Sequence, residues 1–185
     1  MGLKIRVDPF SYILGAAILL LLPAKIWMAA LFAASVHELY HLATLWLLGG
    51  QVTQLRLGIC GAKIVTLPMS RGREVLCALA GPMGSFSLLA LASRYPLAAL
   101  FGCIQGAYNL LPVYPLDGGR VFRGIFSEAF CAAAEAFSLV ILWGMGIWLL
   151  FHCHVGFFVL FPAVSATVLM LRRKYPCKEP NFAVQ

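Results

Sequence analysis

The chain of 185 residues is too apolar for an ordinary soluble domain. Hydrophobic residues make up 62% of it and charged residues 11%, whereas soluble domains are about half apolar and about a quarter charged. The net charge is +7, but the basic residues are dispersed among predicted loops without interleaved aromatic residues, which argues against nucleic-acid binding. We therefore interpret most of the chain as lying in a lipid bilayer.

Apolar runs that approach the roughly 20 residues needed to cross a hydrocarbon core predict an all-α polytopic membrane protein with about six transmembrane helices. A cleaved signal peptide is the alternative for the first run. That run is long for such a peptide, and no small-residue cleavage site follows it, so we interpret it as a retained span. The predicted spans are residues 10–22, 26–48, 74–93, 97–111, 129–151 and 155–171.

The basic residues favour one orientation of these spans, because Lys and Arg near span ends are retained in the cytoplasm. With the N-terminus inside, only Lys25 and Arg94 of the 14 basic residues fall on the outer side. Both termini are therefore predicted to be cytoplasmic. Residues 1–171 form one integral-membrane domain in this interpretation, and residues 172–185 form a short basic cytoplasmic tail.

The first candidate for chemistry is an H-E-x-x-H sequence in the second predicted span. His37 and His41 lie four residues apart, so a helix places both imidazoles on one face, where they can bind a single Zn²⁺ ion. Glu38 can act as the general base of a metalloprotease. Polar residues in the middle of an apolar span are costly without a function. The alternative is a polar cluster that only ties helices together.

A catalytic zinc site needs a third protein ligand, and Asp117 is the best candidate among the remaining acidic residues. It follows Pro112 and Pro115, which end the short fourth span, and precedes Gly118 and Gly119, which permit unusual backbone conformations. Irregular backbone at membrane depth must be buried in protein or line a wet cavity. Such a segment can fold back and bring Asp117 to the metal. The alternative is that Asp117 is an ordinary loop residue at a Pro/Gly turn.

Other polar residues have simpler interpretations. Glu135, about two turns into the fifth predicted helix, is expected to pair with a basic loop residue. The triplet His152-Cys153-His154 is expected to form a polar turn, with a second metal site as the minor alternative. The six cysteines are scattered and include no C-x-x-C pair, so they are interpreted as small hydrophobic residues.

The combination of motifs resembles the site-2 protease family of intramembrane zinc metalloproteases. The resemblance rests on H-E-x-x-H at residues 37–41, on N-L-L-P-x-x-P-L-D-G-G at residues 109–119, and on the weaker A-G-P signature at residues 80–82. The compact layout is most similar to the bacterial sporulation-type (SpoIVFB-like) branch. Family members carry an Asn shortly after A-G-P, where this chain has Gly84 and Ser85. The resemblance implies that His37, His41 and Asp117 hold one Zn²⁺ in a bacterial cell membrane.

The implied activity is hydrolysis of a peptide bond by zinc-activated water, with Glu38 passing the proton to the leaving amine. Asn109 is a candidate for substrate binding or transition-state support, and capping or tying the fourth helix is its equally weighted alternative. Residues 51–57 and 62–67 predict two short strands with a Gly-containing turn. Such a membrane-associated hairpin can hold an unwound substrate at its free edge, whereas a simple amphipathic loop is the alternative.

The expected partners are a membrane-tethered protein substrate and the lipid bilayer, with membrane-protein inhibitors or regulators as further candidates. The family branch suggests a sporulation sigma-factor precursor as the substrate. A transporter is the main rival interpretation, but neither a half-repeat nor acidic residues spread along the spans are present. A catalytically silent scaffold is the second rival. Its usual sign is the loss of Glu38 or of a ligand, and all four residues are present.

Overall fold

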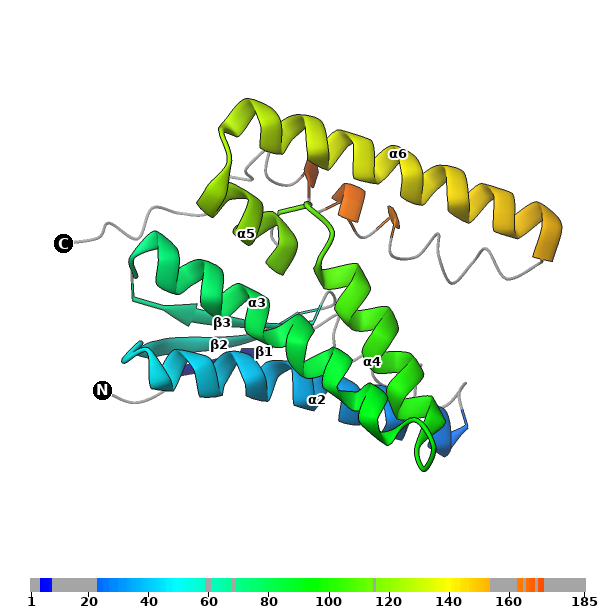
Figure 1. Ribbon diagram of the computed structural model, residues 1–185, viewed down its shortest axis with the longest axis horizontal. Helices are drawn as coiled ribbons and strands as arrows, with labels where there is room; N and C mark the ends of the chain where they lie inside the picture. The colour runs from blue at the N-terminus through cyan, green and yellow to red at the C-terminus, as the bar shows by residue number, and fades with distance from the viewer. Residues whose placement is uncertain are drawn as a thin grey trace.

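The computed structural model describes residues 4–7, 23–58, 61–67, 69–114, 116–153, 163–164, 166–168 and 170–171. The predicted span at 10–22 and the predicted tail from residue 172 lie outside these residues. The described part is mainly helical, with a three-stranded sheet near α2 (Figure 1).

Helix α2 (Ala24–Leu47) carries the H-E-x-x-H sequence and follows the predicted span 26–48 closely. It begins directly after Pro23 and ends at Leu47, two residues before Gly49, whose φ of 70° is left-handed. The backbone N–H of Gly50 donates to the carbonyl of Leu45 at 2.9 Å, the pattern that closes a helix with a glycine cap. The buried residues of α2 recur every four positions and form one stripe: Ala33, His37, His41 and Leu45.

That buried stripe of α2 faces two further helices, because α2 packs against both α3 and α4. Helix α3 (Arg71–Ser87) continues into the 3-10 turn η1 (Leu88–Leu91), and α4 (Pro96–Asn109) returns alongside it. The 14 residues of α4 extend only about 21 Å. This is less than the roughly 30 Å of a hydrocarbon core, so α4 is too short to be a full span by itself.

Two more helices follow the Pro-rich segment. Helix α5 (Asp117–Ile125) was not predicted, and α6 (Glu128–Cys153) corresponds to the predicted span 129–151. The segment between α4 and α5 is partly buried, with Val113 and Leu116 enclosed by protein, which agrees with the expectation that irregular backbone at membrane depth packs against protein. Its residues Val113 and Leu116 share a core cluster with Leu139 of α6 and with Ala166 near the end of the chain.

Two helical segments of the described residues are long and apolar enough to cross a membrane: Arg71–Leu91 and Glu128–His152. The structure therefore supports membrane-spanning helices without confirming the predicted number of six. Helix α2 has 24 residues but is not one of the two. Its polar motif residues lower its mean hydropathy. Only part of the last predicted span, 155–171, is described; residues 163–164, 166–168 and 170–171 are helical.

The sheet has the order β1-β2-β3. Strands β2 (Val52–Gly58) and β3 (Gly61–Thr66) pair antiparallel where the sequence predicts two short strands. Strand β1 (Lys4–Val7) was not predicted and pairs parallel with β2. Parallel pairing requires a crossover, which here includes α2. Because β2 has a neighbour on both sides, the edges of this sheet are β1 and β3.

Candidate metal centre

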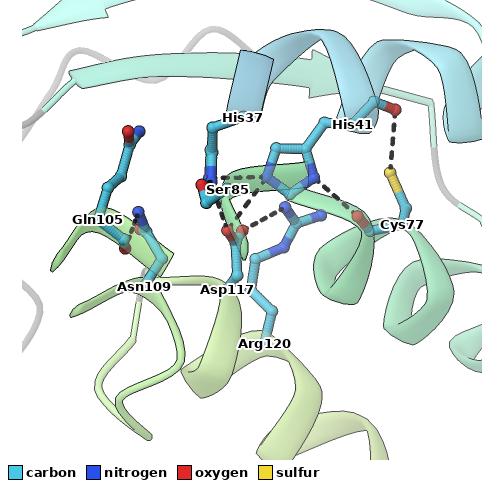
Figure 2. A network of polar contacts seen from close by, with 8 residues as sticks. All are labelled: His37, His41, Cys77, Ser85, Gln105, Asn109, Asp117 and Arg120. Atoms are coloured by element: carbon cyan, nitrogen blue, oxygen red, sulfur yellow. Dashed lines mark hydrogen bonds and ion pairs between the residues drawn. The ribbon is translucent and has the colours of Figure 1, made fainter. Parts of the chain in front are cut away.

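Three side chains from two distant segments converge on one point (Figure 2). The Nε2 atoms of His37 and His41 lie 3.2 and 3.1 Å from Oδ2 of Asp117, and 3.2 Å from each other. All three residues are buried. Their candidate ligand atoms lie within 4.8 Å of one another, and they form a group that could hold a metal ion. The sequence prediction that brought Asp117 to the histidines thus agrees with the geometry.

The outer nitrogen of each imidazole is held by helix α3. His41 Nδ1 lies 2.7 Å from the backbone carbonyl of Cys77, and His37 Nδ1 lies 2.8 Å from Oγ of Ser85. A carbonyl oxygen only accepts, so His41 Nδ1 must donate, and in the neutral ring the lone pair then lies on Nε2. That lone pair faces an ionised carboxylate, which also only accepts. A cation or a bound proton must therefore lie between them.

The close approach of α2 to α3 depends on Gly81 of the A-G-P signature. A Cβ atom at this position would collide with Nε2 of His41 and would lie 2.8 Å from Cε1 of His37. Cys77, Gly81 and Ser85 recur every four residues along α3, and His41 and His37 recur every four residues along α2. His41 meets Cys77 while His37 meets Ser85, so the two helices run antiparallel with matching periods.

Asp117 is the first residue of α5 and not part of a folded-back loop. The predicted role of Gly118 and Gly119 was wrong, because both are helical and neither has a positive φ. Their absent side chains allow contact with the segment after α4. A Cβ on Gly118 would collide with the Leu110 carbonyl oxygen, and a Cβ on Gly119 would lie 2.5 Å from Tyr114 N.

An arginine approaches the second oxygen of Asp117. Arg120 Nη1 lies 3.9 Å from Asp117 Oδ1, and its Nη2 lies 3.6 Å from Oε1 of Glu74 on α3. In Figure 2 the guanidinium approaches the carboxylate from the side away from His37. This leaves Oδ2 facing the two imidazoles. The pairing fixes the orientation of the carboxylate and connects α5 to the first turn of α3.

The two other proposed site residues are placed differently. Glu38 follows His37 on α2 and is partly exposed, as a residue that must reach water needs to be. Asn109 ends α4, and its Nδ2 donates to the Gln105 carbonyl at 3.1 Å. Figure 2 draws this contact together with the three candidate ligands. This contact within α4 is the one expected if Asn109 caps or ties the helix.

The remaining polar residues agree in part with the sequence analysis. Glu135 is buried and pairs with Arg123 at 3.9 Å, as predicted, although Arg123 belongs to α5 and not to a loop. His152 and Cys153 end α6 instead of forming a turn, and His152 Nδ1 lies 3.0 Å from the Trp148 carbonyl. His154 lies outside the described residues.

Sequence reasoning missed the supporting residues on α3 and the role of Arg120. The available signal was the spacing from Gly81 to Ser85, which puts a small residue and a hydroxyl on one helical face. Ser85 lies one turn after Gly81 on this face, and its hydroxyl lies 2.8 Å from Nδ1 of His37.

The chain resembles known proteins in sequence and in fold. No protein-family model matches the chain. The chain is 26% identical over 152 residues to a zinc metalloprotease of Methanocaldococcus jannaschii, covering 70% of this chain and 44% of that protein. It thus spans less than half the length of that relative. A solved site-2 protease from the same organism covers 100% of this chain and 96% of its own, with 19% identity and a TM-score of 0.62. The chain therefore has the fold of a site-2 protease.

Proposed function

We propose that this chain is an intramembrane zinc metalloendopeptidase of the site-2 protease type. The observation that carries the proposal is the convergence of His37, His41 and Asp117, whose candidate ligand atoms lie within 4.8 Å of one another. Two imidazoles and a carboxylate are a donor set typical of catalytic zinc sites, which keep a fourth position open. The named relative supports the choice of zinc and of protease chemistry.

The residues present fit one zinc ion per chain. His37, His41 and Asp117 would hold the Zn²⁺ ion, which would supply a Lewis acid for activating water and polarising a carbonyl. Glu38 then removes a proton from the attacking water and delivers it to the leaving amine as the C–N bond breaks. Cys77 and Ser85 engage the Nδ1 atoms of His41 and His37, which keeps both Nε2 atoms directed towards Asp117 Oδ2, where the ion would be held.

The substrate must arrive as an extended segment, because a helical peptide has its carbonyls engaged in its own hydrogen bonds. Strand β3 is the edge of the hairpin that is open to strand addition, since β1 covers the outer side of β2. We infer that an unwound part of a membrane-tethered protein pairs along Gly61–Thr66 before cleavage. Asn109 remains a candidate for support of the transition state, in competition with its contact to Gln105.

The cellular role rests on the sequence resemblance. The proposal places the chain in a bacterial cell membrane as a multi-pass protein with both termini in the cytoplasm, where it releases a cytoplasmic product. A sporulation sigma-factor precursor is the proposed substrate for the SpoIVFB-like branch, by analogy alone. Membrane-protein inhibitors or regulators are further proposed partners.

The test is zinc content of detergent-purified protein, measured by metal analysis beside cleavage of a co-expressed membrane-tethered reporter. Wild type and Glu38→Gln should each contain close to one zinc per chain, and only wild type should cleave. Asp117→Ala should lose zinc and activity. Glu128→Gln, which removes a carboxylate at the start of α6, is the matched control and should behave as wild type. Folded wild type without zinc, or cleavage by Glu38→Gln, would refute the proposal and favour the polar-cluster interpretation.

Strand addition is tested separately by single proline substitutions along β3. Proline removes a backbone donor, so substitutions at residues whose N–H points away from β2 should slow reporter cleavage while zinc content stays unchanged. Normal cleavage in all such variants would remove β3 from the mechanism.

A further inference from the structure

A pocket with a volume of about 340 Å³ lies outside the metal centre, where α3, α5 and α6 meet. Arg71, the first residue of α3, lines it together with Arg123 from the last turn of α5. Gly124 allows the two helices to meet, because a Cβ there would collide with Val75 of α3. No part of this pocket belongs to the proposed proteolytic machinery.

The pocket lies at a membrane boundary. Both segments that can cross a membrane begin at it, since Arg71 starts one and Glu128 starts the other. In Figure 1 the first turns of α3 and α6 lie at the same end of the molecule. With both segments inserted in the membrane as the proposed function requires, the pocket lies at the level where hydrocarbon gives way to lipid headgroups in one leaflet.

The charge at the pocket is suited to an anion. Arg71 forms no ion pair within the described part of the chain. Arg123 is held in place by Glu135 at 3.9 Å and by the ring of Tyr114 at 4.2 Å. The N-terminal turn of α6 adds a partial positive charge. Glu128 is the opposing carboxylate in the lining, so its removal should make the pocket more favourable for an anion.

An apolar surface continues from this charged pocket. Phe126 lines the pocket and packs against Phe130 with ring centroids 4.8 Å apart, and both side chains are about half exposed. Phe122 completes the aromatic cluster. A ligand with an anionic head and an apolar tail satisfies both surfaces at once.

We propose that this pocket binds the headgroup of an anionic phospholipid, with its phosphodiester at Arg71 and Arg123 and its acyl chain along Phe126 and Phe130. The lipid joins the starts of α3 and α6 and fixes the depth of the helices in the bilayer. A free phosphate shares the headgroup chemistry, but it makes no use of the aromatic cluster.

The test is native mass spectrometry of the full-length protein released from nanodiscs that contain phosphatidylcholine with or without phosphatidylglycerol. Wild type should retain phosphatidylglycerol selectively. Arg71→Gln should bind it about fivefold more weakly, the effect of one basic residue near an anionic surface, and Glu128→Gln should bind it more tightly. Arg73→Gln, which removes the same charge from an exposed position two residues away, is the matched control and should match wild type.

Zinc content and circular dichroism of each variant establish that it is folded. Equal retention by wild type and Arg71→Gln would overturn the proposal, as would equal losses in Arg71→Gln and Arg73→Gln. Soluble glycerophosphoglycerol and inorganic phosphate serve as competitors. If either displaces the lipid at a concentration close to that of the lipid itself, the pocket is a soluble-phosphate site and the lipid proposal is wrong. Loss of reporter cleavage has no bearing on this result.

Discussion

Replacement of Gly81 by alanine should weaken zinc binding without weakening the helix that carries this residue. The added Cβ would lie 2.5 Å from Cε1 of His41 and 2.8 Å from Cε1 of His37. Ordinary contact begins at 3.4 Å, so the His37 ring must retreat by about 0.6 Å, and the His41 ring by more than about 0.9 Å because its Nε2 lies closer still to the added Cβ. A displacement of about 1 Å in a catalytic group costs on the order of a hundredfold in rate.

The expected result for Gly81→Ala is zinc affinity lowered about tenfold to a hundredfold, by analogy with the loss of groups that orient metal ligands. Reporter cleavage should fall at least as far. Alanine is the better helix former by about 1 kcal/mol in water, so weaker helix formation cannot explain the loss. Competition with a chromogenic chelator measures the affinity, and cleavage of the membrane-tethered reporter measures the rate.

Gly72→Ala is the matched control, because Gly72 lies in the same helix and a Cβ there would meet nothing within 4 Å. It should bind zinc and cleave like wild type. Unchanged zinc affinity and cleavage in Gly81→Ala would show that α2 and α3 do not approach as closely as the structure places them.

Three other substitutions test the surroundings of the metal donors. Ser85→Ala removes the 2.8 Å contact to His37 Nδ1 and should lower zinc affinity about tenfold to a hundredfold; an unchanged chelator titration would contradict this. Arg120→Gln removes a longer contact of 3.9 Å to Asp117, so zinc affinity should fall about tenfold at most. A larger fall would contradict the interpretation that Arg120 only orients the carboxylate. Asn109→Ala should preserve zinc content and slow cleavage if its amide assists catalysis, whereas a loss of folded protein by circular dichroism would identify a structural role.

The sequence predicts the local part of the site well. H-E-x-x-H fixes two side chains on one helical face, and no tertiary information is needed for that. Asp117 was identified by its setting among prolines and glycines, and its side chain does lie beside the histidines. The helix that begins at Asp117 was missed because Gly118 and Gly119 have low helix propensity. Packing against the segment after α4 overrides that propensity.

Features that depend on distant contacts could not be predicted in the same way. Strand β1 has four residues, and its partner β2 lies beyond the whole of α2, so no local pattern marks it. The contact of Ser85 with His37 joins residues 48 positions apart. The number of spans also depends on more than apolarity. Helix α2 loses hydropathy through the polar residues of H-E-x-x-H, and α4 is too short to cross alone.

Helix α3 explains how two motifs far apart in the sequence form one site. Towards α2 it presents the Cys77 carbonyl and the Ser85 hydroxyl, which orient the two imidazoles. Towards α5 it presents Val75 against Gly124, while Glu74 pairs with the arginine that approaches Asp117. Both ligand-bearing helices are thus positioned against the same helix. The distance between the histidines and the carboxylate is therefore set in part by residues that are not candidate metal ligands, and substitutions on α3 should alter zinc affinity without removing a candidate ligand.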